Sequence, residues 1–208
     1  MLLACLASPA AAAEPPAKAA VPCDQAPGLA QAFTGVTTLR AAFTDRKEIA
    51  LLDAPLVSKG HLFYQRPDRL HMVTESPSRQ AVTLAGTKVK VVQKDLGREQ
   101  AMDLSASDIA KAVVSNILLV LGGRIDELTQ LYRCSAEAEA DAWHLSLIPL
   151  KEPMSKVIRR MDVRMARDGT LREVRVEELG GDASTMTFTD LQANRPFTDP
   201  EVRSYFTP

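Results

Sequence analysis

The sequence lacks an excess of charge of either sign: 25 Lys and Arg residues stand against 26 Asp and Glu residues, a formal net charge of −1 over 208 residues. Without a basic field there is no electrostatic attraction to nucleic acid, which we exclude as a partner. Aromatic residues are also scarce, at 5%, so the apolar residues are mainly aliphatic and adaptable. A chain of this length is expected to form one domain with a large core, and we expect a monomer.

No internal segment reaches the roughly 20 apolar residues that would span a bilayer. The chain begins instead with a short apolar run over residues 2–7, and the three alanines at 11–13 have the small-x-small form of a signal peptidase site. A basic n-region is missing, and we therefore expect that the true start lies upstream or that Met1 is misassigned. These features predict export to the periplasm, with a signal peptide over 1–13, a flexible segment over 14–22 and a single domain over 23–208.

Cysteine is rare, with three residues in the chain. Removal of the signal peptide leaves Cys23 and Cys134, which in an exported protein are most simply one disulfide, the alternative being two buried thiols. Cys5 follows Leu2, Leu3 and Ala4 in a sequence like a lipobox, which would make it a lipidated anchor. Four preceding residues leave no room for a signal, so we do not favour this anchor.

Short segments with strict alternation of apolar and polar residues dominate the second half of the chain. A period of two with one apolar face is typical of an antiparallel sheet that covers something on one side. The alternating apolar sets are Trp143, Leu145 and Leu147; Met161, Val163 and Met165; Val174 and Val176; Met186 and Phe188.

Residues 109–121 form the one long, nearly all-apolar segment and predict a helix over the apolar face of the sheet. Ile109, Val113, Ile117 and Leu121 would plug the sheet as ordinary core. Val114, Leu118 and Leu119 extend the apolar surface around the helix, which favours a lined cavity instead. The residues alone leave these two alternatives open.

The other elements follow from local signals. We expect a helix from Asp24 to about Thr38, strands over 39–51, 56–65, 68–75, 81–85 and 87–94, a capping box of Ser105 with Asp108, and a short helix over 124–131. Gly122 and Gly123 would end the long helix. The tail over 194–208 gives no element.

Signals for catalysis are few. His61, His71 and His144 all lie on the strand parity opposite the apolar residues and should point outward, without Cys, Asp or Glu at ligand spacing. No G-x-S-x-G sequence is present, and no serine or cysteine lies beside a plausible base. We therefore expect no enzyme activity, no cofactor and no metal.

An ordered set of motifs resembles the periplasmic lipoprotein carriers of the LolA type. It comprises Phe43-Thr44, the strand over 55–65 that ends in Arg66-Pro67, the apolar helix, the run over 143–149 (WHLSLIP) and the Asp168-Gly169 turn. The resemblance implies a mostly β protein with helices: an incomplete, strongly curved antiparallel β-barrel closed by a helical lid. It also implies that Arg66 holds this lid shut.

The sequence departs from the family pattern at Met72, where an aromatic is usual, and at Asp45, where a Gln is common. The cysteine pair is not a general family feature either. We therefore expect a divergent member whose cargo is the acyl chains of lipoproteins or of another envelope lipid, with an inner-membrane donor complex and an outer-membrane acceptor. The alternatives are an envelope structural or interaction domain with a filled core, and a lipid-modifying hydrolase.

The predicted cavity lining consists of the inward-facing apolar residues of the strands and the helix. These are Phe43, Leu62, Tyr64, Leu70, Met72, Val89, Val91, Ile109, Val113, Ile117, Leu121, Trp143, Leu145, Leu147, Met161, Val163, Met165, Val174, Val176, Met186 and Phe188.

Overall fold

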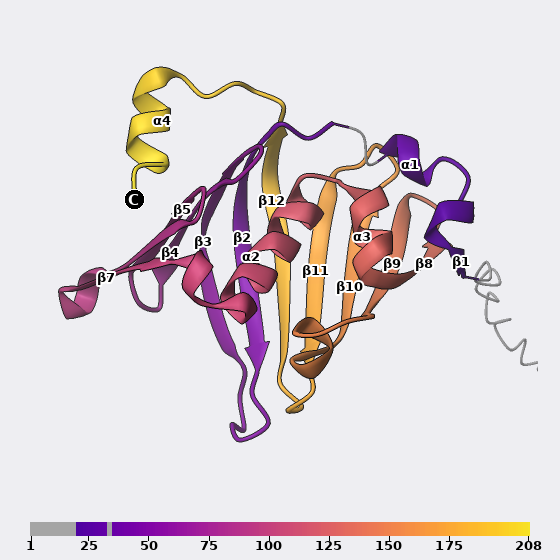
Figure 1. Ribbon diagram of the computed structural model, residues 1–208, viewed down its shortest axis with the longest axis horizontal. Coiled ribbons are helices and arrows are strands. Elements are labelled where there is room, and N and C mark those ends of the chain that lie inside the picture. The colour runs from indigo at the N-terminus through magenta and orange to yellow at the C-terminus, as the bar shows by residue number, and fades with distance from the viewer. Residues whose placement is uncertain (1–19, 33–34) are drawn as a thin grey trace, which may run out of the picture.

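A single antiparallel sheet of twelve strands forms the body of the protein in this computed structural model, which describes residues 20–32 and 35–208. Its strand order is β1-β8-β9-β10-β11-β12-β2-β3-β4-β5-β6-β7, and the two end strands do not pair with each other. The sheet curves strongly around helices α2 and α3, which lie across its concave side (Figure 1). The expected fold class, an open and curved antiparallel barrel closed by helices, is therefore confirmed.

The strands of the sheet are β1 (Val21–Pro22), β2 (Thr38–Glu48), β3 (Leu56–Gln65), β4 (Arg69–Ser76), β5 (Gln80–Ala85), β6 (Lys88–Gln93), β7 (Arg98–Asp103), β8 (Tyr132–Ala138), β9 (Ala142–Pro149), β10 (Ile158–Ala166), β11 (Leu171–Glu178) and β12 (Ala183–Ala193). The helices are α1 (Leu29–Ala32), α2 (Asp108–Leu121), α3 (Ile125–Leu131) and α4 (Asp199–Tyr205), with 3-10 turns η1 (Cys23–Gln25), η2 (Lys94–Leu96), η3 (Leu104–Ala106) and η4 (Met154–Lys156). Within the described residues, no helix combines the length and apolar character needed to cross a membrane.

The N-terminal part differs from the sequence prediction. A continuous helix from Asp24 to Thr38 is wrong: the structure has only η1 and the four-residue α1 there. Gly28 and Gly35 adopt φ values of +84° and +81°, which break a right-handed helix on both sides of α1. Val21 and Pro22, expected to be flexible, pair with β8. The predicted signal peptide and Cys5 lie outside the described residues.

Three further elements have no counterpart in the sequence prediction, namely β7, β8 and α4. Helix α4 packs on the convex side of the sheet, where the Tyr205 ring stacks on Phe63 with centroids 4.1 Å apart. The Arg40 guanidinium lies 3.7 Å from the centroid of Phe197 and forms an ion pair with Glu201 at 3.2 Å. Aromatic and cation–π contacts therefore hold the tail against the sheet.

The start of α2 also differs in detail. The cap is Ser107, whose hydroxyl accepts a hydrogen bond from the backbone N–H of Ala110 at 3.2 Å, and the expected box of Ser105 with Asp108 does not form. Ser105 lies in η3, where its own N–H donates to Asp103. The extra turn of η3 shifts the helix start by two residues.

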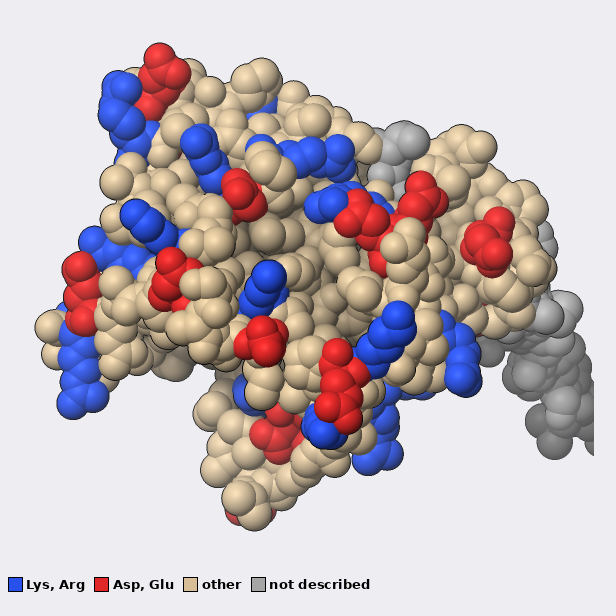
Figure 2. Space-filling model, in the orientation of Figure 1, with Lys and Arg blue, Asp and Glu red and all other residues tan. Residues whose placement is uncertain are grey.

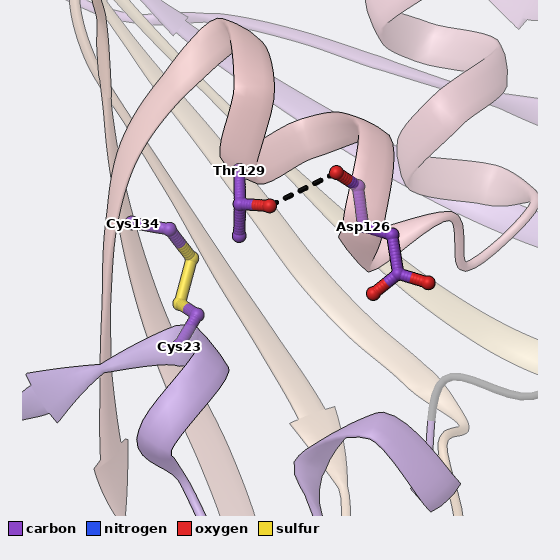
Figure 3. The surroundings of a disulfide bond; sticks show 4 residues. All are labelled: Cys23, Asp126, Thr129 and Cys134. Carbon is purple, nitrogen blue, oxygen red and sulfur yellow. Dashed lines mark hydrogen bonds between the residues drawn. A yellow bond between two sulfur atoms is a disulfide. The ribbon is translucent and has the colours of Figure 1, made fainter.

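A disulfide joins Cys23 of η1 to Cys134 of β8, across 111 positions of sequence, the pair that the sequence proposes. Figure 3 shows it beside α3, in which the Thr129 hydroxyl donates to the Asp126 carbonyl at 2.9 Å. The bond therefore ties the N-terminal segment to the edge of the sheet that carries α3.

Replacement of both cysteines by serine should lower the free energy of unfolding by about 4–5 kcal/mol, because a crosslink over a loop of this length restricts the unfolded chain. Denaturant titration of the variant and the oxidised wild type measures this difference. Alkylation under denaturing conditions is the control and should label neither Cys23 nor Cys134 before a reductant is added. Immediate labelling of both thiols would contradict the disulfide.

Candidate functional site

The strand register collects the predicted lining residues on the concave face of the sheet. Direct partners on neighbouring strands point to the same face, and the partners here form continuous apolar rows. One row crosses β3 to β6 through Leu62, Met72, Val82 and Val91, and a second crosses the same strands through Tyr64, Leu70, Leu84 and Val89. A third crosses β9 to β12 through Leu145, Val163, Val174 and Met186.

Burial divides the predicted lining into three groups. The fully buried group comprises Phe43, Leu62, Tyr64, Leu70, Val89, Leu121, Trp143, Leu145, Leu147, Met161, Val163, Met165 and Phe188. The half-buried group is Met72, Val91, Val113, Val174, Val176 and Met186. The exposed pair is Ile109 and Ile117, at 52% and 41%. The concave apolar face is thus incompletely covered.

Helix α2 covers the concave face with a stripe other than the one that the sequence analysis assigned to ordinary core. Ala110, Val114 and Leu118 pack against the core, whereas Ile109 and Ile117 do not plug the sheet as ordinary core. Both stripes have the four-residue spacing of one helix face. Because the helix is apolar on most sides, the spacing alone could not decide which stripe turns inward. Contact of Ile109 and Ile117 with a cargo stays a prediction.

A cavity of about 70 Å³ lies between the end of α2 and the sheet. Its walls include Val120 and Leu121 of α2, Met165 of β10, Leu171 of β11 and Leu191 of β12. Sites for drug-sized ligands occupy about 300–1,000 Å³. The helix and sheet therefore lie too close together here for a whole acyl chain, and binding one requires α2 to move away from the sheet.

Arg66 lies where such a movement would be controlled. Its guanidinium Nη2 donates a hydrogen bond of 2.6 Å to the carbonyl of Gly122, the residue that ends α2. Pro67 follows Arg66 and β3 ends at Gln65, which places the guanidinium at the rim of the sheet. A cation on the last carbonyls of a helix is favoured by the helix dipole. The residue predicted to control the lid thus joins the sheet to the helix.

The side chain of Tyr64 lies against Gly122, next to the Arg66 hydrogen bond. A Cβ added to Gly122 would lie 2.8 Å from the Tyr64 hydroxyl, closer than such atoms approach in proteins. Gly122 has a φ of −80°, which any residue can adopt. The short distance to the Tyr64 hydroxyl, and not the backbone conformation, therefore explains why this position is a glycine. Burial raises the pKa of the Tyr64 phenol, and the nearby Arg66 opposes this rise. The phenol is therefore neutral at physiological pH.

Two further polar groups lie under the helices, and the sequence prediction missed both. Asn116 of α2 is 7% exposed, and its side-chain Nδ2 has no hydrogen-bond partner among the described residues. The hydroxyl of Tyr132 at the start of β8 also has none, and burial raises its pKa to about 12. A lone amide in an apolar helix was the available signal for Asn116. Unpaired buried polar groups weaken the closed packing.

The histidines lie where strand parity placed them, on the convex side. His61 is 3.4 Å from Glu75, and His144 is 3.3 Å from Asp162. His71 is less solvated than expected, since its ring lies against Tyr205 and burial lowers its pKa. In the described part of the chain, no group of three His, Cys, Asp or Glu side chains could hold a metal ion.

Comparison of the sequence with known proteins identifies similar lipoprotein carriers. A family model described as "Outer membrane lipoprotein carrier protein LolA" matches residues 34–201. The outer-membrane lipoprotein carrier protein of Chromohalobacter salexigens is 27% identical over 137 residues, which are 66% of this chain and 61% of that protein. The chain therefore spans less than two thirds of the length of this relative.

Solved structures give weaker likenesses. A LolA superfamily protein from Nitrosomonas europaea has a TM-score of 0.46 and 11% identity, covering 86% of this chain and 96% of that one. The MucA/MucB complex of Pseudomonas aeruginosa contains a chain with a TM-score of 0.44 and 16% identity, covering 84% of this chain and 58% of that one. Both scores lie below 0.5, and the fold described above rests on the strand register.

Replacement of Gly122 by alanine should lower the free energy of unfolding by about 1–3 kcal/mol, because the new methyl group meets the Tyr64 hydroxyl. Denaturant titration measures the loss. Gly180→Ala is the matched control, since a Cβ there has no atom within 4 Å and should change stability little. Equal effects of the two substitutions would show that the end of α2 is not seated against Tyr64.

Proposed function

This chain belongs to the family of the outer membrane lipoprotein carrier protein LolA, and on that premise we propose that it is a periplasmic carrier of acylated cargo. It binds the acyl chains of a lipoprotein, or of another envelope lipid, between the concave face of the sheet and α2. It takes the cargo from a donor complex in the inner membrane and delivers it to an acceptor at the outer membrane. It acts by binding and release, without catalysis.

The single observation that carries this proposal is a concave apolar face covered by a helix that is held at one end by the Arg66–Gly122 hydrogen bond. An ordinary core would gain from aromatic packing and complete burial. Here, Val174, Val176 and Met186 remain half-buried beneath the helix layer. Flexible aliphatic side chains of this kind adapt to ligands of variable shape.

The free energies of the interactions involved support the idea that cargo binding moves α2 away from the sheet. A hydrogen bond to a charged group contributes about 1.5–3 kcal/mol. Each methylene group removed from water contributes about 0.8 kcal/mol. About two to four buried methylenes therefore offset the loss of the Arg66–Gly122 hydrogen bond, and an acyl chain supplies many more. Release then needs only an acceptor that binds the acyl chains more tightly.

A structural envelope domain is the second candidate, and the cavity of about 70 Å³ favours it. In that case α2 would be permanent cover for the sheet, and the protein would act through its outer surface. Lipid content distinguishes the two functions, because a permanently filled core has no space for acyl chains.

Mass spectrometry of the protein purified from its native envelope should detect co-purifying acylated molecules at close to one per chain. A Val174→Asp variant should carry far fewer, because it places a charge on the half-buried concave surface. Ala101→Asp, at an exposed position on β7, is the control and should leave the lipid content unchanged. Wild-type protein free of acylated molecules would favour the structural domain.

Arg66→Leu should change the affinity for a fluorescent acyl probe by a factor between about 10 and 150, because the lost hydrogen bond alters the balance of open and closed forms. Folding should be nearly unaffected, since Arg66 lies at the sheet rim. Arg69→Leu is the matched control: Arg69 donates to Gln65 on the neighbouring strand and makes no bond to α2. Unchanged probe affinity and release in Arg66→Leu would leave Arg66 as an ordinary surface residue.

A further inference from the structure

The loop between β2 and β3 is apolar and exposed, although loops that connect strands are usually polar. Apart from Asp53, every residue from 49 to 57 is apolar. Leu51 is 94% exposed, and Leu52, Leu56 and Val57 are 48%, 50% and 45% exposed. Figure 1 shows this hairpin reaching past the neighbouring β11–β12 turn at the lower end of the molecule. We call residues 49–57 the apolar tip.

The apolar tip is held in place at its base. The backbone N–H of Ala50 donates to the carboxylate of Asp182 in the β11–β12 turn at 3.1 Å. The N–H of Leu52 donates to the carbonyl of Ile49 at 2.9 Å, which closes a turn. The leucine side chains are therefore presented outward by an ordered backbone, and contact with a partner costs little additional ordering.

Charges around the base of the apolar tip are paired within the chain. Arg46 forms an ion pair with Glu48, Lys47 lies 3.8 Å from Glu178, and Arg175 lies 3.7 Å from Glu48. In Figure 2 the lowest projection of the molecule is formed mainly by uncharged residues. The tip itself carries one exposed charge, the carboxylate of Asp53, on an otherwise apolar surface, so the contact it offers to a partner is mainly apolar.

We propose that the apolar tip inserts into the surface of a lipid bilayer. The tip is a narrow projection, and a protein partner would need a matching pocket, whereas a bilayer closes around an apolar projection of any shape. The paired charges at its base lower the cost of approaching the less polar interface. Insertion of two leucines gives weak, reversible attachment. This contact is separate from the concave face, so the inference and the proposed acyl binding can fail independently.

Flotation with vesicles tests the proposal on the full chain. The wild-type protein should float with phosphatidylcholine vesicles, and no better with vesicles of phosphatidylethanolamine and phosphatidylglycerol, because the one charge of the tip, on Asp53, is negative. The double variant Leu51→Ser, Leu52→Ser should bind at least about tenfold more weakly. Leu96→Ser is the matched control, since Leu96 is 62% exposed on a different hairpin turn, and it should float like the wild type.

Tryptophan fluorescence locates the contact. The chain has one tryptophan, Trp143, which is 4% exposed and should not respond to vesicles. A tryptophan introduced by Leu51→Trp should shift to shorter wavelength when vesicles are added, and one introduced by Leu96→Trp should not. The serine variant should keep the acyl-probe affinity of the wild type, because the tip is separate from the concave face. This measurement shows that the variant is folded.

Several outcomes would overturn the proposal. They are wild-type protein that does not float, a serine variant that floats like the wild type, flotation with anionic vesicles alone, or a Leu51→Trp signal that does not shift. Wild-type chains that associate with one another through the apolar tip, with no vesicle binding, would assign this surface to a second copy of the chain.

Discussion

The structure depends on one constraint, namely that the concave face of a curved antiparallel sheet is apolar and must be covered. Leu145, Val163, Val174 and Met186 stand side by side across four strands, and without a cover this row would lie in water. Helices α2 and α3 provide the cover (Figure 1). The helix therefore has to be apolar itself, which explains the unusual composition of residues 108–121.

A carrier needs this cover to be removable, and the parts of the molecule differ in how firmly they are held. The disulfide between Cys23 and Cys134 fixes the β8 edge, and stacked aromatic rings hold α4 on the convex side. At the end of α2, Leu119, Val120 and Leu121 are buried in the core, the Arg66 guanidinium donates to the Gly122 carbonyl, and Gly122 lies against the Tyr64 phenol. Asn116 of the same helix has a side-chain amide with no hydrogen-bond partner among the described residues, which reduces the advantage of the closed arrangement. The proposed carrier function requires this helix to move, and the unpaired amide lowers the cost of that movement.

Strand prediction succeeded where side-chain alternation was strict. The outward parity of His61 and His144 is found in the structure, because a period of two allows only one assignment of faces. Prediction failed for the helix over residues 24–38, where positive φ angles at two glycines override the local apolar pattern. It also missed α4, whose position depends on contacts with β2 and β3 from the other end of the chain.

The sequence by itself determined the antiparallel sheet, the apolar face of each strand and the presence of an over-apolar helix, because these depend on the spacing of neighbouring residues. The tertiary structure alone decided which stripe of α2 faces the sheet, that Arg66 meets Gly122, and that the loop over 49–57 projects uncovered. Each of these depends on distances between segments that are far apart in sequence. Apolar spacing cannot encode such distances when a helix is apolar on most of its sides.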